Sequence, residues 1–180
     1  KRRGAGTFVM DLPVEKMEKM LMDIQMMGTT AFYPDKTITS RVLDFSVVKA
    51  TPEIADKLKI KETSFVYKIN RVRFVNDKPT VIEETYMPID LITGLRLEQV
   101  EHSIYDYIEN DLGLKIQSGH RTITVRRATD TEAHYLDLES GDPVAVAVQT
   151  GYLNTGVAFE YSISKHRYDE FSVEIVLTHN

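Results

Sequence analysis

The nine residues ATPEIADKL, Ala50–Leu58, return later in the chain as ATDTEAHYL, Ala128–Leu136. In each copy, the threonine that follows the first alanine is a residue type that often caps the start of a helix. Pro52 suits the first turn of a helix in the first copy, and Glu132 has the capping-box spacing from Thr129 in the second. The two segments therefore predict short helices at equivalent places of an internal repeat.

The repeat extends to the segments on both sides of these helices. Thr39–Lys49, rich in Val, Ile and Phe, precedes the first helix, Ile116–Arg127 precedes the second, and both predict strands. Each helix is followed by a predicted hairpin, Ser64–Val75 with Thr80–Met87 and Val144–Leu153 with Val157–His166. An ungapped alignment of the halves matches Val66 with Val144, Phe74 with Tyr152 and Asn76 with Asn154, and one deletion in the turn then brings Glu83 onto Glu160.

Two strand–helix–hairpin units predict an α+β fold with a pseudo-symmetric repeat. Because hairpins dominate, we expect a mostly antiparallel sheet with helices packed on one face, and a ligand between the two units. Chance similarity of two generic units is the alternative, since short apolar positions match easily.

Two further helices are predicted outside the repeat. Between Pro13 and Gly28, apolar residues recur at helical spacing and predict a helix that packs on the core or on a dimer partner. Ser103-Ile104-Tyr105-Asp106 has capping-box spacing and begins an apolar stripe that Gly113 closes. The N-terminus of this helix is suited to phosphate, although plain capping by Ser103 explains the same residues.

Composition narrows the class of protein. The chain has 180 residues, 42% hydrophobic and 27% charged, as expected for one compact domain. It contains no cysteine, which excludes disulfides and thiolate metal sites, and its net charge of -5 disfavours a nucleic-acid-binding surface. No apolar run approaches membrane-spanning length and no signal core is visible. We therefore expect a cytoplasmic protein that does not bind membranes.

Motifs of catalysis are absent from the sequence. There is no GxxxxGK[ST] loop, GxSxG elbow or HExxH motif, and the five histidines show no close pairing at metal-ligand spacing. We expect no bound metal, no cofactor and no enzymatic activity.

Arg71 and Arg73 are the first candidates for a binding site. They lie two residues apart on a predicted strand, so both side chains leave the same, otherwise apolar face. The planar guanidinium fork is suited to carboxylate or phosphate. A three-residue turn would pair Arg71 with Glu83 and a two-residue turn with Glu84, and such a pair, or simple solvation, is the alternative explanation.

Glu160 is the second candidate. It lies between Phe159 and Tyr161, a setting in which a carboxylate accepts hydrogen bonds from hydroxyl groups of a polar ligand. A surface position explains it equally well when it is taken alone.

Several segments, taken in order and spacing, resemble a known family. Gly4–Val9 resembles the end of the wing in the winged helix-turn-helix of GntR-superfamily repressors of the HutC-like branch. The segments that resemble the UTRA domain of those regulators are Ser40-Arg41-Val42-Leu43, Arg71-Val72-Arg73, Glu83 ahead of Tyr86-Met87-Pro88, Ser103-Ile104-Tyr105-Asp106-Tyr107 and Phe159-Glu160-Tyr161. The resemblance implies a chorismate-lyase-like fold. It also implies that residues 1–10 are the remnant of the wing or linker of a missing winged helix-turn-helix domain and that 11–180 are a UTRA-like effector-binding and dimerisation domain.

The resemblance further implies a homodimeric sensor of a small anionic metabolite, a sugar phosphate or amino-sugar phosphate. Binding would control, allosterically, the operator DNA affinity of a transcriptional repressor through the missing N-terminal domain. Phosphate would contact Ser40, Arg41, Arg71, Arg73, Ser103 and Tyr105, while sugar hydroxyls would contact Glu83 and Glu160. His166 stands where some amino-sugar-phosphate members carry tyrosine, which leaves the exact sugar open. The alternatives are a small enzyme of the same fold acting on an anionic substrate, and a dimerisation domain without a ligand.

Overall fold

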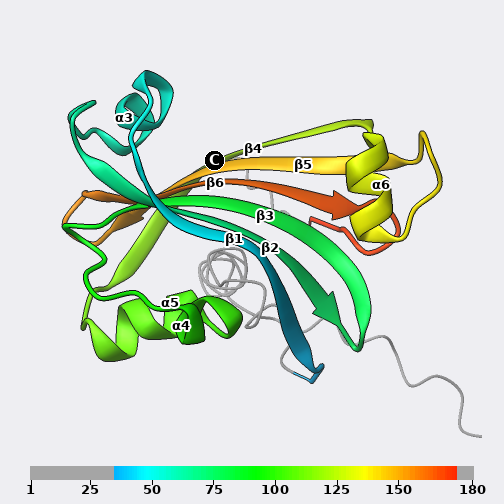
Figure 1. Ribbon diagram of the computed structural model, residues 1–180, viewed down its shortest axis with the longest axis horizontal. Coiled ribbons are helices and arrows are strands. Elements are labelled where there is room, and N and C mark those ends of the chain that lie inside the picture. The colour runs from blue at the N-terminus through cyan, green and yellow to red at the C-terminus, as the bar shows by residue number, and fades with distance from the viewer. Residues whose placement is uncertain (1–34, 174–180) are drawn as a thin grey trace, which may run out of the picture.

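The computed structural model describes residues 35–173, and two predicted features, the Pro13–Gly28 helix and the expected wing remnant at residues 1–10, lie outside them (Figure 1). The elements are, in chain order, β1 (Ile38–Lys49), α3 (Pro52–Leu58), β2 (Phe65–Val75), β3 (Lys78–Pro88), α4 (Leu97–Glu101), α5 (Ile104–Asp106), the π-helical turn η1 (Tyr107–Asp111), β4 (Ile116–Arg127), α6 (Asp130–Leu136), β5 (Pro143–Leu153) and β6 (Ala158–Arg167). The strands predicted from the sequence all lie within two residues of these bounds, whereas α4 was not predicted.

The strands form one antiparallel sheet in the order β1-β2-β3-β6-β5-β4. The units β1-α3-β2-β3 and β4-α6-β5-β6 therefore meet at their last strands, as two copies related by a pseudo-twofold axis would (Figure 1). Thr85 lies opposite Ser162 at this junction, and the matched residues Glu83 and Glu160 each precede them by two positions. The predicted α+β fold with a pseudo-symmetric repeat is confirmed.

The two repeat helices begin and end in the same way. The hydroxyl of Thr51 accepts a hydrogen bond from the backbone N–H of Ile54, and that of Thr129 accepts one from Glu132, as N-caps do. Lys59 and Asp137 end the helices in left-handed conformation, with φ of 54° and 53°. Local sequence thus sets equivalent boundaries for α3 and α6.

Helices cover both faces of the sheet, so the expectation that they pack on one face is wrong (Figure 1). We call the side of α3 and α6 the α3 face and the side of α4, α5 and η1 the α4 face. The segment between β3 and β4 lies outside the repeat, and it supplies apolar residues that need a second core. This core on the α4 face contains Ile69, Met87, Ile92, Leu95, Val100, Ile104, Ile108, Leu153 and Phe159.

The β2–β3 hairpin combines a two-residue turn with a bulge. Asn76 and Asp77 both have positive φ, 49° and 66°, which suits a tight hairpin turn. The pairing then shifts by one residue, because Phe74 lies opposite Pro79 while Arg73 lies opposite Val81. Of the two pairings that the sequence left open, the structure has Arg71 opposite Glu83 and not opposite Glu84, because the bulge follows the two-residue turn.

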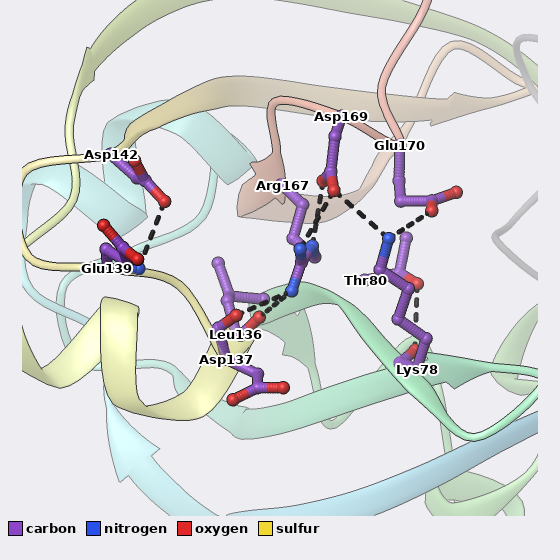
Figure 2. Close-up of polar contacts among 9 residues, drawn as sticks. All are labelled: Lys78, Thr80, Leu136, Asp137, Glu139, Asp142, Arg167, Asp169 and Glu170. Atoms are coloured by element: carbon purple, nitrogen blue, oxygen red, sulfur yellow. Dashed lines mark hydrogen bonds and ion pairs between the residues drawn. The ribbon is translucent and has the colours of Figure 1, made fainter.

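The end of β6 is tied to the end of α6 by a buried arginine. Arg167, 9% exposed, donates hydrogen bonds to the backbone carbonyls of Leu136 and Asp137 and to both carboxylate oxygens of Asp169 (Figure 2). Asp169 also accepts a hydrogen bond from Lys78, at 3.1 Å. Arg167 thus joins the end of α6 to the end of β6, and Asp169 links both to Lys78 at the β2–β3 hairpin.

Candidate functional site

Arg71, Arg73 and Glu83 lie side by side on the α4 face, and we call these three residues the arginine cluster. Arg71 Nε donates to Glu83 Oε2 at 2.7 Å, and the two side chains are only 11% and 12% exposed. Arg73, 2% exposed, donates through Nη1 to the hydroxyl of Ser40 at 2.8 Å. The cluster therefore places two guanidiniums and one carboxylate in a largely dry environment.

Backbone carbonyls in the last turn and at the C-cap of α4 complete the hydrogen bonds of the cluster. Arg71 Nη1 donates to the carbonyl of Val100 at 2.7 Å, and Arg73 Nη1 donates to that of His102 at 2.7 Å. These carbonyls are neutral acceptors, whereas an ionised acceptor binds a guanidinium about twice as strongly. An anion that reaches the cluster can therefore compete with them.

Burial destabilises the charged form of Arg73 more than the neighbouring charges stabilise it. Desolvation lowers the pKa of Arg73 to about 10, Glu83 opposes this shift, and the like charge of Arg71 adds to it. Arg73 thus stays protonated at neutral pH, and an anion beside it would be bound more tightly for the same electrostatic reason.

Glu160 is the centre of a second polar group in the other half of the sheet. Its Oε1 accepts hydrogen bonds from the hydroxyl of Ser162 at 2.7 Å and from Nε2 of Gln149 at 3.5 Å. The Gln149 amide also donates to the hydroxyl of Tyr105 at 3.4 Å. Burial raises the pKa of Glu160, and hydrogen bonds from Ser162 and Tyr105 oppose the shift. Such a carboxyl is suited to hydrogen bonds with hydroxyl groups.

His166 lies opposite Val81 on β3 and packs its ring 4.5 Å from that of Phe171. Desolvation lowers its pKa from 6.5 to about 4, so the imidazole is neutral at physiological pH. His166 can therefore offer a hydrogen bond to a ligand without adding charge.

This buried imidazole makes stability depend on pH. The unfolded chain protonates His166 near pH 6.5 and the folded chain only near pH 4. The stability that the folded protein gains from a neutral His166 is therefore fully present above pH 6.5, and it is lost as the pH drops towards 4. We expect a loss of about 2 kcal/mol between pH 7.5 and 5, measured by urea denaturation. His166→Gln should remove most of this loss and the exposed His134→Gln should not; equal pH dependence in all three proteins would contradict the assignment.

Ser103 lies beside the arginine cluster, and Tyr105 lies at the Glu160 group. The hydroxyl of Ser103 accepts a hydrogen bond from the backbone N–H of Asp106 at 3.2 Å, so it caps α5 in this structure. Its neighbour His102 supplies the carbonyl that Arg73 contacts. The structure thus brings the start of α5 to the arginine cluster, while Tyr105 reaches the Glu160 group.

Arg41 is the one predicted site residue that the structure does not bring together with the others. It lies opposite Val72, on the α3 face, and its guanidinium is 5.3 Å from the ring centre of Tyr135. Successive side chains of a strand point to opposite faces, so Ser40 and Arg41 cannot both face the same ligand on the sheet. We leave Arg41 out of the proposed site.

The structure adds residues that the sequence did not indicate. Gln149 and Ser162 contact Glu160, and Arg121 Nε donates to the side-chain amide oxygen Oε1 of Gln149 at 2.7 Å. The repeat carried a signal for Gln149, because the ungapped alignment places it at the position of Arg71. No sequence pattern indicates that the backbone carbonyls of Val100 and His102 contact the arginine cluster.

Residues 35–173 contain neither a candidate metal site nor a helix that could span a membrane. These residues contain no cluster of His, Asp and Glu that could hold a metal ion. Their helices are also too short and too polar for any of them to cross a membrane.

The fold and its polar groups describe an effector-binding domain, and comparison with known proteins gives its family. The UTRA domain family matches residues 35–172, and the chain belongs to it. The regulator GmuR of Bacillus subtilis is 36% identical over 98% of this chain and 74% of its own length. The mannosyl-D-glycerate transport/metabolism system repressor MngR of Escherichia coli is 29% identical over 97% of this chain and 71% of its own length.

A solved structure agrees with the fold. The possible transcriptional regulator YydK of Bacillus subtilis superposes with a TM-score of 0.75 at 35% identity, covering 81% of this chain and 65% of that one. A GntR-family transcriptional regulator of Bacillus cereus superposes with a TM-score of 0.68 at 38% identity, covering 78% of this chain and 99% of that one. These relatives are named as transcriptional regulators or repressors, so the expected regulator class is confirmed and the enzyme alternative is not supported.

Proposed function

We propose that this domain binds a small phosphorylated sugar and, through that binding, controls operator affinity in a homodimeric repressor of the cytoplasm. The phosphate contacts Arg71 and Arg73, with Ser40 beside them, and sugar hydroxyls contact Glu83 and Glu160. The observation that carries the proposal is the buried arginine pair, whose guanidiniums donate to the replaceable carbonyls of Val100 and His102.

The charge of the cluster favours a dianionic group over a neutral one. Two guanidiniums face one ion-paired carboxylate, so the cluster itself carries a positive charge in a poorly hydrated place. Each charge-assisted hydrogen bond to such a group contributes about 1.5–3 kcal/mol. A carbohydrate-derived effector agrees with the name of MngR, which represses a mannosyl-D-glycerate system.

The same contacts suggest how binding would be transmitted. A phosphate that takes the hydrogen bonds of Arg71 and Arg73 releases the carbonyls at the end of α4, just before the cap of α5. The segment from α4 to η1 would then shift relative to the sheet. A tenfold change in operator affinity needs only about 1.4 kcal/mol of such coupling.

A ligand panel tests the proposal. We expect phosphorylated hexoses or amino sugars to raise the melting temperature, with about 2.7 kcal/mol of stabilisation at a hundred times the dissociation constant, and their unphosphorylated parents to leave it unchanged. Amide hydrogen exchange should change in residues 97–111 with the same ligand. Stabilisation by the parent sugars, or by no member of a broad phosphorylated panel, would overturn the proposed function.

A further inference from the structure

The two halves of the sheet offer different chemistry at matching places. In the alignment of the repeat, Gln149 takes the place of Arg71, and Glu160 takes the place of Glu83. The contact is preserved, since each carboxylate accepts a hydrogen bond from the matched side chain. Where the first half has an ion pair, the second half thus has a neutral amide beside a buried carboxyl.

Arg121 adds a positive charge at the outer edge of the second half. It lies opposite Gln149 on β4, Gln149 lies opposite Ser162, and Ser162 lies opposite Thr85. This row across the sheet puts Arg121 on the α4 face, the face of the arginine cluster. Arg121 is exposed, contacts Gln149 through Nε, and forms no ion pair with any carboxylate of residues 35–173.

The charge of Arg121 acts on the second polar group. Burial dominates the pKa values of Tyr105 and His166, and the field of Arg121 lowers both. Arg121 therefore lies close enough to these side chains to act on a ligand that contacts them.

The arginine cluster and Arg121 belong to strands that are far apart in the sheet. Arg71 on β2 and Arg121 on β4 are separated by four strand spacings, about 19 Å between backbones. Both side chains are long, so a ligand between these strands can place its phosphate at Arg71 and its opposite end at Arg121.

We propose that Gln149 and Arg121 determine specificity for that opposite end, and that the preferred effector is a phosphorylated sugar derivative with a carboxylate or second phosphate remote from the first. The inference rests on the proposed function. The fork of Arg121 supplies the charge-assisted hydrogen bonds that such a group prefers, and Gln149 holds its Nε side.

Titration calorimetry with matched ligand pairs tests this inference. The pairs are hexitol 6-phosphates and the corresponding 6-phosphoaldonates, for example glucitol 6-phosphate and 6-phosphogluconate, which are both open chains and differ only in the group at carbon 1, remote from the phosphate. We expect the 6-phosphoaldonate to bind about tenfold more tightly, and Arg121→Gln to remove that advantage while leaving the affinity for the hexitol phosphate within twofold.

The matched control is Arg126→Gln, which removes the same charge from the same strand. Arg126 pairs with Glu132 of α6, and its position on β4 places it on the other face. The Arg126→Gln variant should keep the tenfold preference for the 6-phosphoaldonate. Equal binding of the paired ligands, or equal loss of both in Arg121→Gln, would overturn this inference and leave the proposed function standing. If no phosphorylated sugar binds at all, both fall.

Discussion

Replacing Arg71 and Arg73 together with alanine is expected to lower the affinity for a phosphorylated sugar by more than a hundredfold. Two charge-assisted hydrogen bonds at about 1.5–3 kcal/mol each amount to at least that factor. Calorimetry with the ligand identified in the panel measures the change. The parent sugar, which lacks the phosphate, should bind equally weakly to wild type and variant.

The double variant also disturbs the fold, because Glu83 loses its partner at 12% exposure. Removing one member of a buried pair costs about 3–5 kcal/mol. A second variant, Arg71→Gln with Glu83→Gln, removes both charges and restores a neutral hydrogen-bonding pair of two amides. It should stay folded and still lose phosphate-dependent binding.

Arg41→Ala is the control for this experiment. It removes one positive charge from a neighbouring strand, but on the α3 face over Tyr135. Its affinity should remain within twofold of wild type. A loss in Arg41→Ala as large as in the double variant would show that net charge, and not the arginine cluster, holds the ligand.

The repeat made most of the fold predictable. Helix caps, turn residues and strand spacing are local signals, and both copies carry them in the same order, so Thr51 and Thr129 already mark equivalent helices. The packing of α4 and α5 on the opposite face was not predictable in this way. Their segment belongs to neither copy, and its apolar residues do not say which face they cover.

The candidate site was predictable in its side chains but not in its register. Alternation along a strand puts Arg71 and Arg73 on one face. Which glutamate lies opposite Arg71 depends on a bulge at Thr80, and no local sequence motif predicts that bulge. The same alternation separates Arg41 from Ser40, although their shared place in the family motif groups them. The carbonyls of Val100 and His102 lie outside sequence reasoning, because every residue has such a carbonyl.

Arg167→Ala is expected to lower the free energy of unfolding by about 3 kcal/mol. The guanidinium is buried and donates to the carbonyls of Leu136 and Asp137 at the end of α6, so its loss leaves buried carbonyls without a hydrogen bond, each at about 1–3 kcal/mol (Figure 2). The pair with Asp169 adds less, because that carboxylate is 34% exposed.

Urea denaturation of wild type and variant measures this loss, and Arg126→Ala is the matched control. Arg126 also forms a two-oxygen contact with a carboxylate, that of Glu132, but its side chain is 42% exposed, so the control should lose less than about 1 kcal/mol. A similar loss in both variants would mean that Arg167 acts as an ordinary surface ion pair. A large loss for Arg167→Ala with unchanged ligand affinity in the folded fraction would separate the residues that hold the second repeat together from those that bind the effector.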